Sequence, residues 1–175
     1  MKAATNLRRL TVGFALAAVF IVVAARAYAA DQPAVQLSGP HATPRDLEDT
    51  TEKAIVRDYA KAWASLNDAM SQNDASGLNE MWVGFAREEF SNTITQQQAA
   101  GMTTRYLDHG HRLEPVFYSI EGSSMQLRDT AQIETQVLDG SKIVASHTDS
   151  MHYLVVMTPA ADHWQVRILQ AVPGF

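Results

Sequence analysis

The stretch SMQLRDTAQIETQVLDGSKIVASHTDSMHYLVVMT, residues 124–158, contains two long runs in which polar and apolar residues alternate. Alternation with a period of two is typical of β-strands that bury one face and expose the other. Asp139-Gly140 separates the runs, and this dipeptide is typical of a tight hairpin turn. The stretch therefore predicts an antiparallel hairpin with strands at 124–138 and 142–158.

Two further strands are predicted on either side of this hairpin. Residues 116–121 precede it across the turn Gly122-Ser123, and residues 163–171 follow it across a polar loop. Consecutive strands joined by short turns pair antiparallel. The second half of the chain therefore predicts a four-stranded antiparallel sheet.

Upstream, apolar residues recur every three or four positions over 44–72, which predicts one long amphipathic helix. Thr43 is a suitable N-cap and Pro44 a suitable first helical residue. Asp49 with Glu52 offers an alternative start of the capping-box type.

Two shorter helices are predicted after the long one. Asp74 caps the first, at 75–81, and the second covers 95–109 with Gly110 just beyond its end. Helices gathered before strands indicate the α+β class, with the helices packed on a curved antiparallel sheet that forms a cone-shaped half-barrel.

The first 29 residues predict an export signal. A basic start and the apolar run Leu10–Ala25 lead to Ala27-Tyr28-Ala29, an A-x-A cleavage pattern. A retained membrane anchor is the alternative, but the apolar run reaches only about 24 Å as a helix, less than the ~30 Å hydrocarbon core. We therefore expect a signal peptide at 1–29, a linker at 30–43 and one α+β domain at 44–175, with the mature protein periplasmic or secreted.

Charge and composition exclude several classes of protein. The chain has no Cys, which excludes disulfides, thiol nucleophiles and iron–sulfur clusters. Its formal net charge is −5, and cleavage after Ala29 would remove four of 14 basic residues and no acidic one, leaving −9. An acidic chain is unsuited to binding nucleic acid, so we expect no nucleic-acid partner. Because cleavage would also remove the apolar run, we expect no stable membrane anchor in the mature protein.

The element order resembles the nuclear transport factor 2-like superfamily, which includes SnoaL-like cyclases, ketosteroid isomerase and scytalone dehydratase. The resemblance covers residues 44–171 and rests on a few positions, namely Tyr59-x-x-x-Trp63, Asp74-x-x-x-Leu78, Tyr153-Leu154-Val155-Val156 and His163-Trp164-Gln165-Val166. It implies a pocket between the helices and the concave sheet face, and a homodimer. It does not imply one activity, because this fold serves enzymes, binding proteins and dimerisation modules.

Three ionisable residues interrupt the apolar faces of the two long strands. The odd-numbered positions of both strands are mainly apolar, and the exceptions are Asp129 on the first strand and His147 and Asp149 on the second. A polar residue on a buried face is a candidate for function.

The turn decides whether these residues meet. A two-residue turn at Asp139-Gly140 would pair odd-numbered with even-numbered positions, which differ in polarity. A three-residue turn pairs Val137 with Ser141 and matches the faces, which places Asp129 opposite Asp149 and one diagonal step from His147. Such a cluster could transfer protons, since neighbouring carboxylates raise one pKa and an imidazole can act as base or acid. A β-bulge would instead turn the second strand's pair to solvent.

Ligand-binding side chains are also predicted on the concave face. Tyr153, Tyr118 and Tyr106 could donate hydrogen bonds to a bound molecule, and Met151 and Met125 could form an adaptable apolar wall.

A second polar group, Asp108, His109 and His111, lies at the end of the third predicted helix. Metal binding by His-x-His is one interpretation, and a favourable position at a helix C-terminus is the other. No third ligand is apparent and no nucleotide-binding motif is present, so we expect neither metal nor cofactor.

Three functions remain open. The first is an exported protein that binds a small apolar or amphipathic molecule without catalysis. The second is a metal-free isomerase or dehydratase using Asp129 or His147 as base. The third is a periplasmic interaction or dimerisation module.

Overall fold

The computed structural model describes residues 34–39 and 41–175. Its elements, in chain order, are β1 (Val35–Leu37), β2 (Thr43–Pro44), α2 (Asp49–Gln72), the 3-10 helix η1 (Ala75–Leu78), α3 (Gly84–Ala99), β3 (Met102–Tyr118), β4 (Met125–Asp139), β5 (Lys142–Pro159) and β6 (Trp164–Val172). The predicted export signal lies outside the described residues and stays a prediction.

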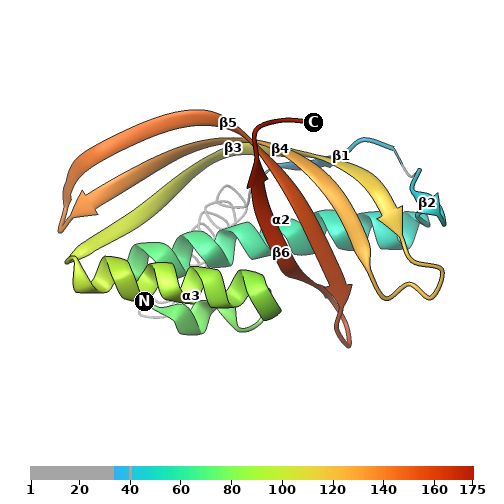
Figure 1. The fold of residues 1–175 in the computed structure, drawn as a ribbon, viewed down its shortest axis with the longest axis horizontal. Helices are drawn as coiled ribbons and strands as arrows, with labels where there is room; N and C mark the ends of the chain where they lie inside the picture. Colours follow the sequence, from blue (N-terminus) through green and yellow to red (C-terminus); the bar gives the residue numbers. More distant parts are fainter. Residues whose placement is uncertain (1–33, 40) are drawn as a thin grey trace, which may run out of the picture. The chain divides into compact units, whose positions relative to one another are not determined.

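The strands form one curved sheet with the order β1-β3-β4-β5-β6, and β2 also pairs with β3 (Figure 1). The hairpin pairs from β3 to β6 are antiparallel, whereas β1 and β2 run parallel to β3. The predicted α+β class is therefore confirmed, with one difference: the sheet is mixed. β1 lies within the stretch predicted as a linker, and β2 lies at its C-terminal end.

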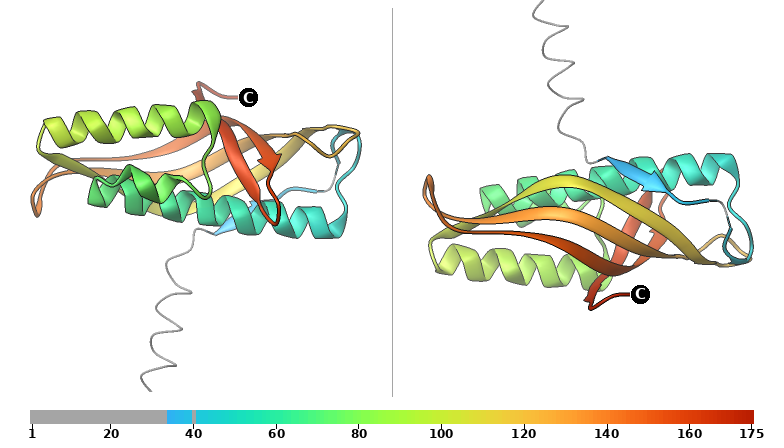
Figure 2. Two further views of the ribbon diagram at one scale, coloured as in Figure 1. Left: turned by 90° about the horizontal axis from the view of Figure 1, so that it is seen from below. Right: turned by 90° about the horizontal axis from the view of Figure 1, so that it is seen from above.

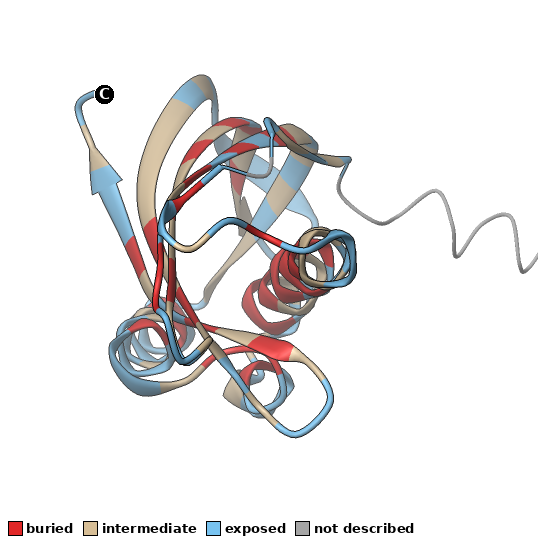
Figure 3. Ribbon diagram, turned by 90° about the vertical axis from the view of Figure 1, so that its right-hand side faces the viewer, coloured by how far each residue is buried: buried red, intermediate tan, exposed pale blue. Residues whose placement is uncertain are grey.

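Helices α2 and α3 lie on the concave side of the sheet (Figure 2). Buried residues recur along one side of α2, and Figure 3 shows them where this helix faces the strands. They are Ile55, Tyr59, Ala62, Trp63, Leu66, Ala69 and Met70. Their three- and four-residue spacing places them on one stripe, so burying them against the sheet holds the helix in place.

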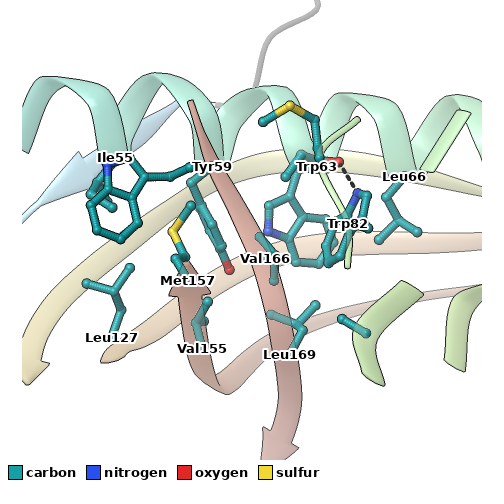
Figure 4. Close-up of a cluster of buried hydrophobic side chains, with 14 of the residues drawn as sticks. Ile55, Tyr59, Trp63, Leu66, Trp82, Leu127, Val155, Met157, Val166 and Leu169 are labelled. Carbon is teal, nitrogen blue, oxygen red and sulfur yellow. Dashed lines mark hydrogen bonds between the residues drawn. The ribbon is translucent and has the colours of Figure 1, made fainter. Parts of the chain in front are cut away.

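Hydrogen bonds complete the attachment of the helices to the core. The indole Nε1 of Trp82 donates to the Ala62 carbonyl at 3.0 Å (Figure 4). Asn67 on α2 accepts the Tyr106 amide of β3 at 2.8 Å. Gln97, the buried polar residue of α3, donates to the Met70 carbonyl at 2.6 Å. These bonds fix the space between both helices and the sheet.

The helix predictions are only partly correct. The long helix ends as predicted but begins at Asp49, because Thr43-Pro44 forms β2 instead of capping it. Asp74 caps η1 by accepting the Ser76 amide at 2.9 Å, as expected for a short helix after α2. The predicted helix at 95–109 is wrong, since α3 ends at Ala99 and β3 begins at Met102.

Strand β3 is irregular, and this irregularity positions the site. Register shifts occur between Asp108 and Gly110 and between Pro115 and Phe117. Each shift leaves one extra residue in the strand, which moves the following side chains to the other face. As a result Asp108 and His111 lie on the same face, although regular alternation would separate them.

The far half of β5 has an open edge. β6 pairs with residues 152–159 only, so within the described chain residues 142–151 have β4 on one side and no strand on the other.

Candidate functional site

A buried polar cluster joins α2, β3 and β4. His111 donates from Nδ1 to Asp129 Oδ2 at 2.8 Å and from Nε2 to Asp108 Oδ2 at 2.7 Å. The Tyr59 hydroxyl donates to the same Asp129 oxygen at 2.8 Å. The side chains of His111 and Asp129 are completely buried. The cluster therefore forms a connected network inside the core.

The bulge in β3 holds this network. Gly110 has φ 129°, a conformation that favours glycine, and its amide donates to Asp108 Oδ1 at 2.8 Å. A Cβ at this position would lie 3.2 Å from the Ala34 carbonyl oxygen. Backbone and side chain together therefore aim the Asp108 carboxylate at His111.

The network keeps His111 protonated. Burial by itself lowers the pKa of an imidazole, but the hydrogen bonds with Asp108 and Asp129 outweigh burial and raise the pKa of His111 to about 9. Both ring nitrogens carry protons and both are bonded to carboxylates. His111 therefore has no free nitrogen with which to accept a proton from a substrate.

One oxygen of the network is unpaired. Asp129 Oδ1 is buried and has no hydrogen-bond partner among the described residues. Asp129 lies opposite Tyr153 in the β4–β5 register, on the face that carries the cavity described below. A buried carboxylate oxygen without a donor is costly. Asp129 does not line the cavity, so this oxygen is a cost within the core and not a contact for a guest.

A cavity of about 130 Å³ lies between the two helices and the concave sheet. Aromatic rings dominate its wall. It is lined by Trp63 and Leu66 of α2, Glu89 and Phe90 of α3, Tyr106 of β3, Tyr153 of β5, and Leu169 and Ala171 of β6. Figure 4 shows Trp63, Leu66 and Leu169 converging from helix and strand.

Trp63 connects the cavity to the polar cluster. Its ring lies 6.1 Å from that of Tyr106 at 83° and 5.8 Å from that of Tyr153 at 57°, measured between centroids. The imidazole of His111 lies 4.7 Å from the Trp63 ring. The cavity wall is thus one ring thick, with the charged network directly behind it.

The two cavity tyrosines are neutral phenols. Burial raises the pKa of Tyr106 to about 12. Burial, with smaller contributions from Tyr106 and Asp129, raises the pKa of Tyr153 further. Both phenols therefore keep their protons at any physiological pH and can donate hydrogen bonds to a guest.

Two wider hollows lie elsewhere on the surface. The larger, about 440 Å³, is bordered by polar side chains such as Gln36, Arg112 and Gln132 beside β1. The other, about 400 Å³, adjoins the cavity at Glu89 and Ala171 and includes the exposed Phe85. The smaller cavity is the stronger candidate because its aromatic wall can surround a guest.

The structure separates the three predicted catalytic residues. Asp139 pairs with Lys142. A bulge then leaves Val144 of β5 without a partner, and in the resulting register Asp129 pairs with Tyr153. The predicted three-residue turn and the pairing of Asp129 with Asp149 are therefore wrong, although odd positions do face odd positions over most of the hairpin. A bulge corrects the register after a shorter turn.

His147 and Asp149 instead bond to each other at the exposed end of β5. Their Nε2 and Oδ2 atoms are 2.7 Å apart, and their side chains are 77% and 46% exposed. They do not contact the buried network.

The predicted ligand-binding residues divide in the same way. Tyr153 and Tyr106 line the cavity. Tyr118 packs against Trp164 and beneath Arg45 at the other end of the sheet. Met125 is buried in the core, and Met151 packs against the core without lining the cavity.

His111 was predicted only as a possible metal ligand in the Asp108, His109 and His111 group, and Trp63 was not predicted as a site residue. His111 was placed after a helix, whereas it lies on β3. The alternation of His111, Leu113 and Pro115 with Arg112 and Glu114 was the signal for a half-buried strand.

Within residues 34–39 and 41–175, no three His, Asp or Glu side chains are arranged to hold a metal ion. No helix in that part of the chain is sufficiently long and apolar to span a bilayer.

Comparisons with known proteins support the fold. No family model matches the chain, and no curated protein matches its sequence. The intermembrane space region of the chloroplast protein ARC6 has a similar structure, with a TM-score of 0.62 at 13% identity over 74% of this chain and 98% of that one.

More distant likenesses include a protein of the NTF2-like family from Streptomyces avermitilis, with a TM-score of 0.45 at 13% identity, covering 68% of this chain and 96% of that one. Another is the Kfla4162 protein from Kribbella flavida, with a TM-score of 0.48 at 10% identity, covering 71% and 90%. These last two likenesses are too distant to support an argument. The predicted fold, helices packed on a curved and unclosed sheet, is confirmed, and the ARC6 region shares it.

Proposed function

We propose that this chain binds a small amphipathic molecule in the cavity between α2, α3 and the concave sheet, and that it does so without catalysis. The observation that carries the proposal is the aromatic wall of Trp63, Phe90, Tyr106 and Tyr153 around a cavity of defined size. The predicted homodimer and export are separate proposals that this one does not need.

The size of the cavity limits the guest. A cavity of 150 Å³ in another protein holds benzene, so 130 Å³ suits one ring or a branched group of similar bulk. Steroids and other fused-ring molecules would have to extend into the neighbouring hollow at Phe85.

The polar cluster supports binding more than proton transfer. Both nitrogens of His111 are bonded to carboxylates, and Asp129 Oδ2 already accepts two hydrogen bonds. His111 and Asp129 would have to break these hydrogen bonds before either could act as a base. The cluster is better suited to holding Trp63 and the strands in place.

The test uses benzyl alcohol as probe and two-dimensional NMR of the purified protein as readout. We expect the amide and side-chain signals of the cavity residues to shift with saturation. Ala171→Phe, which adds a ring at the cavity wall, should abolish the shifts. Gln170→Phe adds the same ring at the neighbouring position, which does not line the cavity, so the signals should still shift in this variant. Shifts that are absent, or that persist in Ala171→Phe, would contradict the proposal.

A further inference from the structure

We infer that the cavity selects a small organic cation, an alkylammonium or quaternary ammonium group, over a neutral molecule of the same shape. This inference rests on the proposed function and specifies the chemical class of its ligand. Three features of the described residues carry it: the rim charge, the buried charge behind the wall and the arrangement of the rings.

The charge at the cavity rim is negative. Among the eight residues that line the cavity, Glu89 is the one with a charged side chain, and no Lys or Arg is among them. A cationic guest would therefore meet no like charge at the wall. The full chain, at −5, also attracts cations from solution.

The buried cluster adds a second negative charge. Asp108 and Asp129 are both bonded to one imidazolium, that of His111, so the three groups together carry about one net negative charge at neutral pH. The member of the cluster that lies against Trp63 is the imidazolium of His111, so a guest behind the indole meets the field of the whole cluster and not that of a bare carboxylate. The unpaired Asp129 Oδ1 belongs to the same cluster.

The rings are arranged as walls and not as a stack. Trp63 meets Tyr106 almost at a right angle and Tyr153 at 57°, with Phe90 contributed from α3. Aromatic faces carry partial negative charge, and a cation within about 6 Å of several ring centroids is attracted to all of them. A neutral guest of equal bulk would gain only the apolar contact.

The test compares choline with 3,3-dimethylbutan-1-ol, in which a carbon atom replaces the charged nitrogen. Isothermal titration of the purified protein with each compound gives two dissociation constants. We expect choline to bind about tenfold more tightly, the effect of a partly desolvated cation over aromatic faces.

Rim variants separate charge from shape. Glu89→Gln should weaken the binding of choline about threefold and leave the dissociation constant of the neutral alcohol unchanged. Glu88→Gln changes an exposed residue of the same helix that does not line the cavity, and it should alter neither constant. Tyr153→Leu replaces the aromatic ring by an aliphatic side chain, so it should weaken the binding of choline more than the binding of the alcohol.

Each outcome bears on a different proposal. Equal affinities, or tighter binding of the alcohol, would overturn the cation inference and leave the binding cavity intact. Failure of choline, the alcohol and benzyl alcohol alike would overturn both. Choline binding that is equally strong in Tyr153→Leu and Glu89→Gln would place the cation elsewhere and overturn the inference.

Discussion

Among the His–Asp pairs of the described residues, two have almost the same geometry and very different surroundings. His111 and Asp129 are 2.8 Å apart and completely buried at the centre of the fold. His147 and Asp149 are 2.7 Å apart at the exposed end of β5. Judged by distance alone, the two pairs would contribute equally to stability.

The difference lies in what water does to each pair. Solvent screens the exposed charges, so their attraction adds little to stability. The buried pair has exchanged water for protein partners, and it depends on Asp108 and Tyr59 to replace the lost hydration. The structure around a pair, more than the pair itself, decides its energetic weight.

The largest effect that we expect from this comparison is that of Asp129→Asn. Removing one charge leaves the His111 imidazolium buried with Asp108 as its single anionic partner, which should lower the free energy of unfolding by about 3 kcal/mol. Urea denaturation at pH 7 measures it. Asp149→Asn is the matched variant in the exposed pair, and equal losses in the two variants would remove the distinction.

The pH dependence of stability sharpens the comparison further. The pKa of His111 rises from 6.5 to about 9 on folding, which at 1.36 kcal/mol per pKa unit is on the order of 3 kcal/mol. Because the folded value is the higher one, this contribution is fully present below pH 6.5 and is lost as pH rises through 9. Unfolding curves recorded from pH 6 to 10 should show the loss, and His111→Gln should flatten it. An unchanged slope in that variant would assign the titration to another group.

A smaller effect is expected from Tyr59→Phe. The hydroxyl of Tyr59 donates to Asp129, and losing a hydrogen bond to a charged group costs about 2 kcal/mol. Tyr106→Phe serves as control, because no described residue accepts a hydrogen bond from the Tyr106 hydroxyl. Thermal denaturation of both variants tests this, and a control as unstable as Tyr59→Phe would show that ring packing, and not the bond, is responsible.

The smallest effect belongs to His147→Gln. This side chain is 77% exposed and pairs only with Asp149, so the free energy of unfolding should stay within experimental error. A loss above 1 kcal/mol would mean that exposure does not separate the two pairs.

Regular alternation made most of the sheet predictable. β4, β5 and β6 start and end within one residue of the predicted bounds, because their side chains follow a period of two over most of their length. The C-terminal end of α2 was also predictable, since its apolar stripe is uninterrupted up to Met70. The turn was less predictable, because Asp139-Gly140 allowed two registers and nothing in the residues indicated the bulge at Val144.

The site was less predictable because β3 changes phase twice. The shifts at Asp108/Gly110 and Pro115/Phe117 break the alternation into three short pieces, none of which is long enough to indicate a 17-residue strand. The first piece was therefore assigned to a helix. Asp129 stood out as a charge on an apolar face, but its partners come from β3 and α2, and long-range pairing of this kind leaves no local pattern.

The open edge of β5, where the exposed pair lies, bears on how molecules of this protein associate in concentrated solution. Residues 142–151 present unpaired amides and carbonyls, the template on which strands of other molecules add and fibrils grow. Ile143 and Val144 are exposed there, and charged side chains on such an edge hinder this growth. His147 and Asp149 are two such polar side chains on this edge.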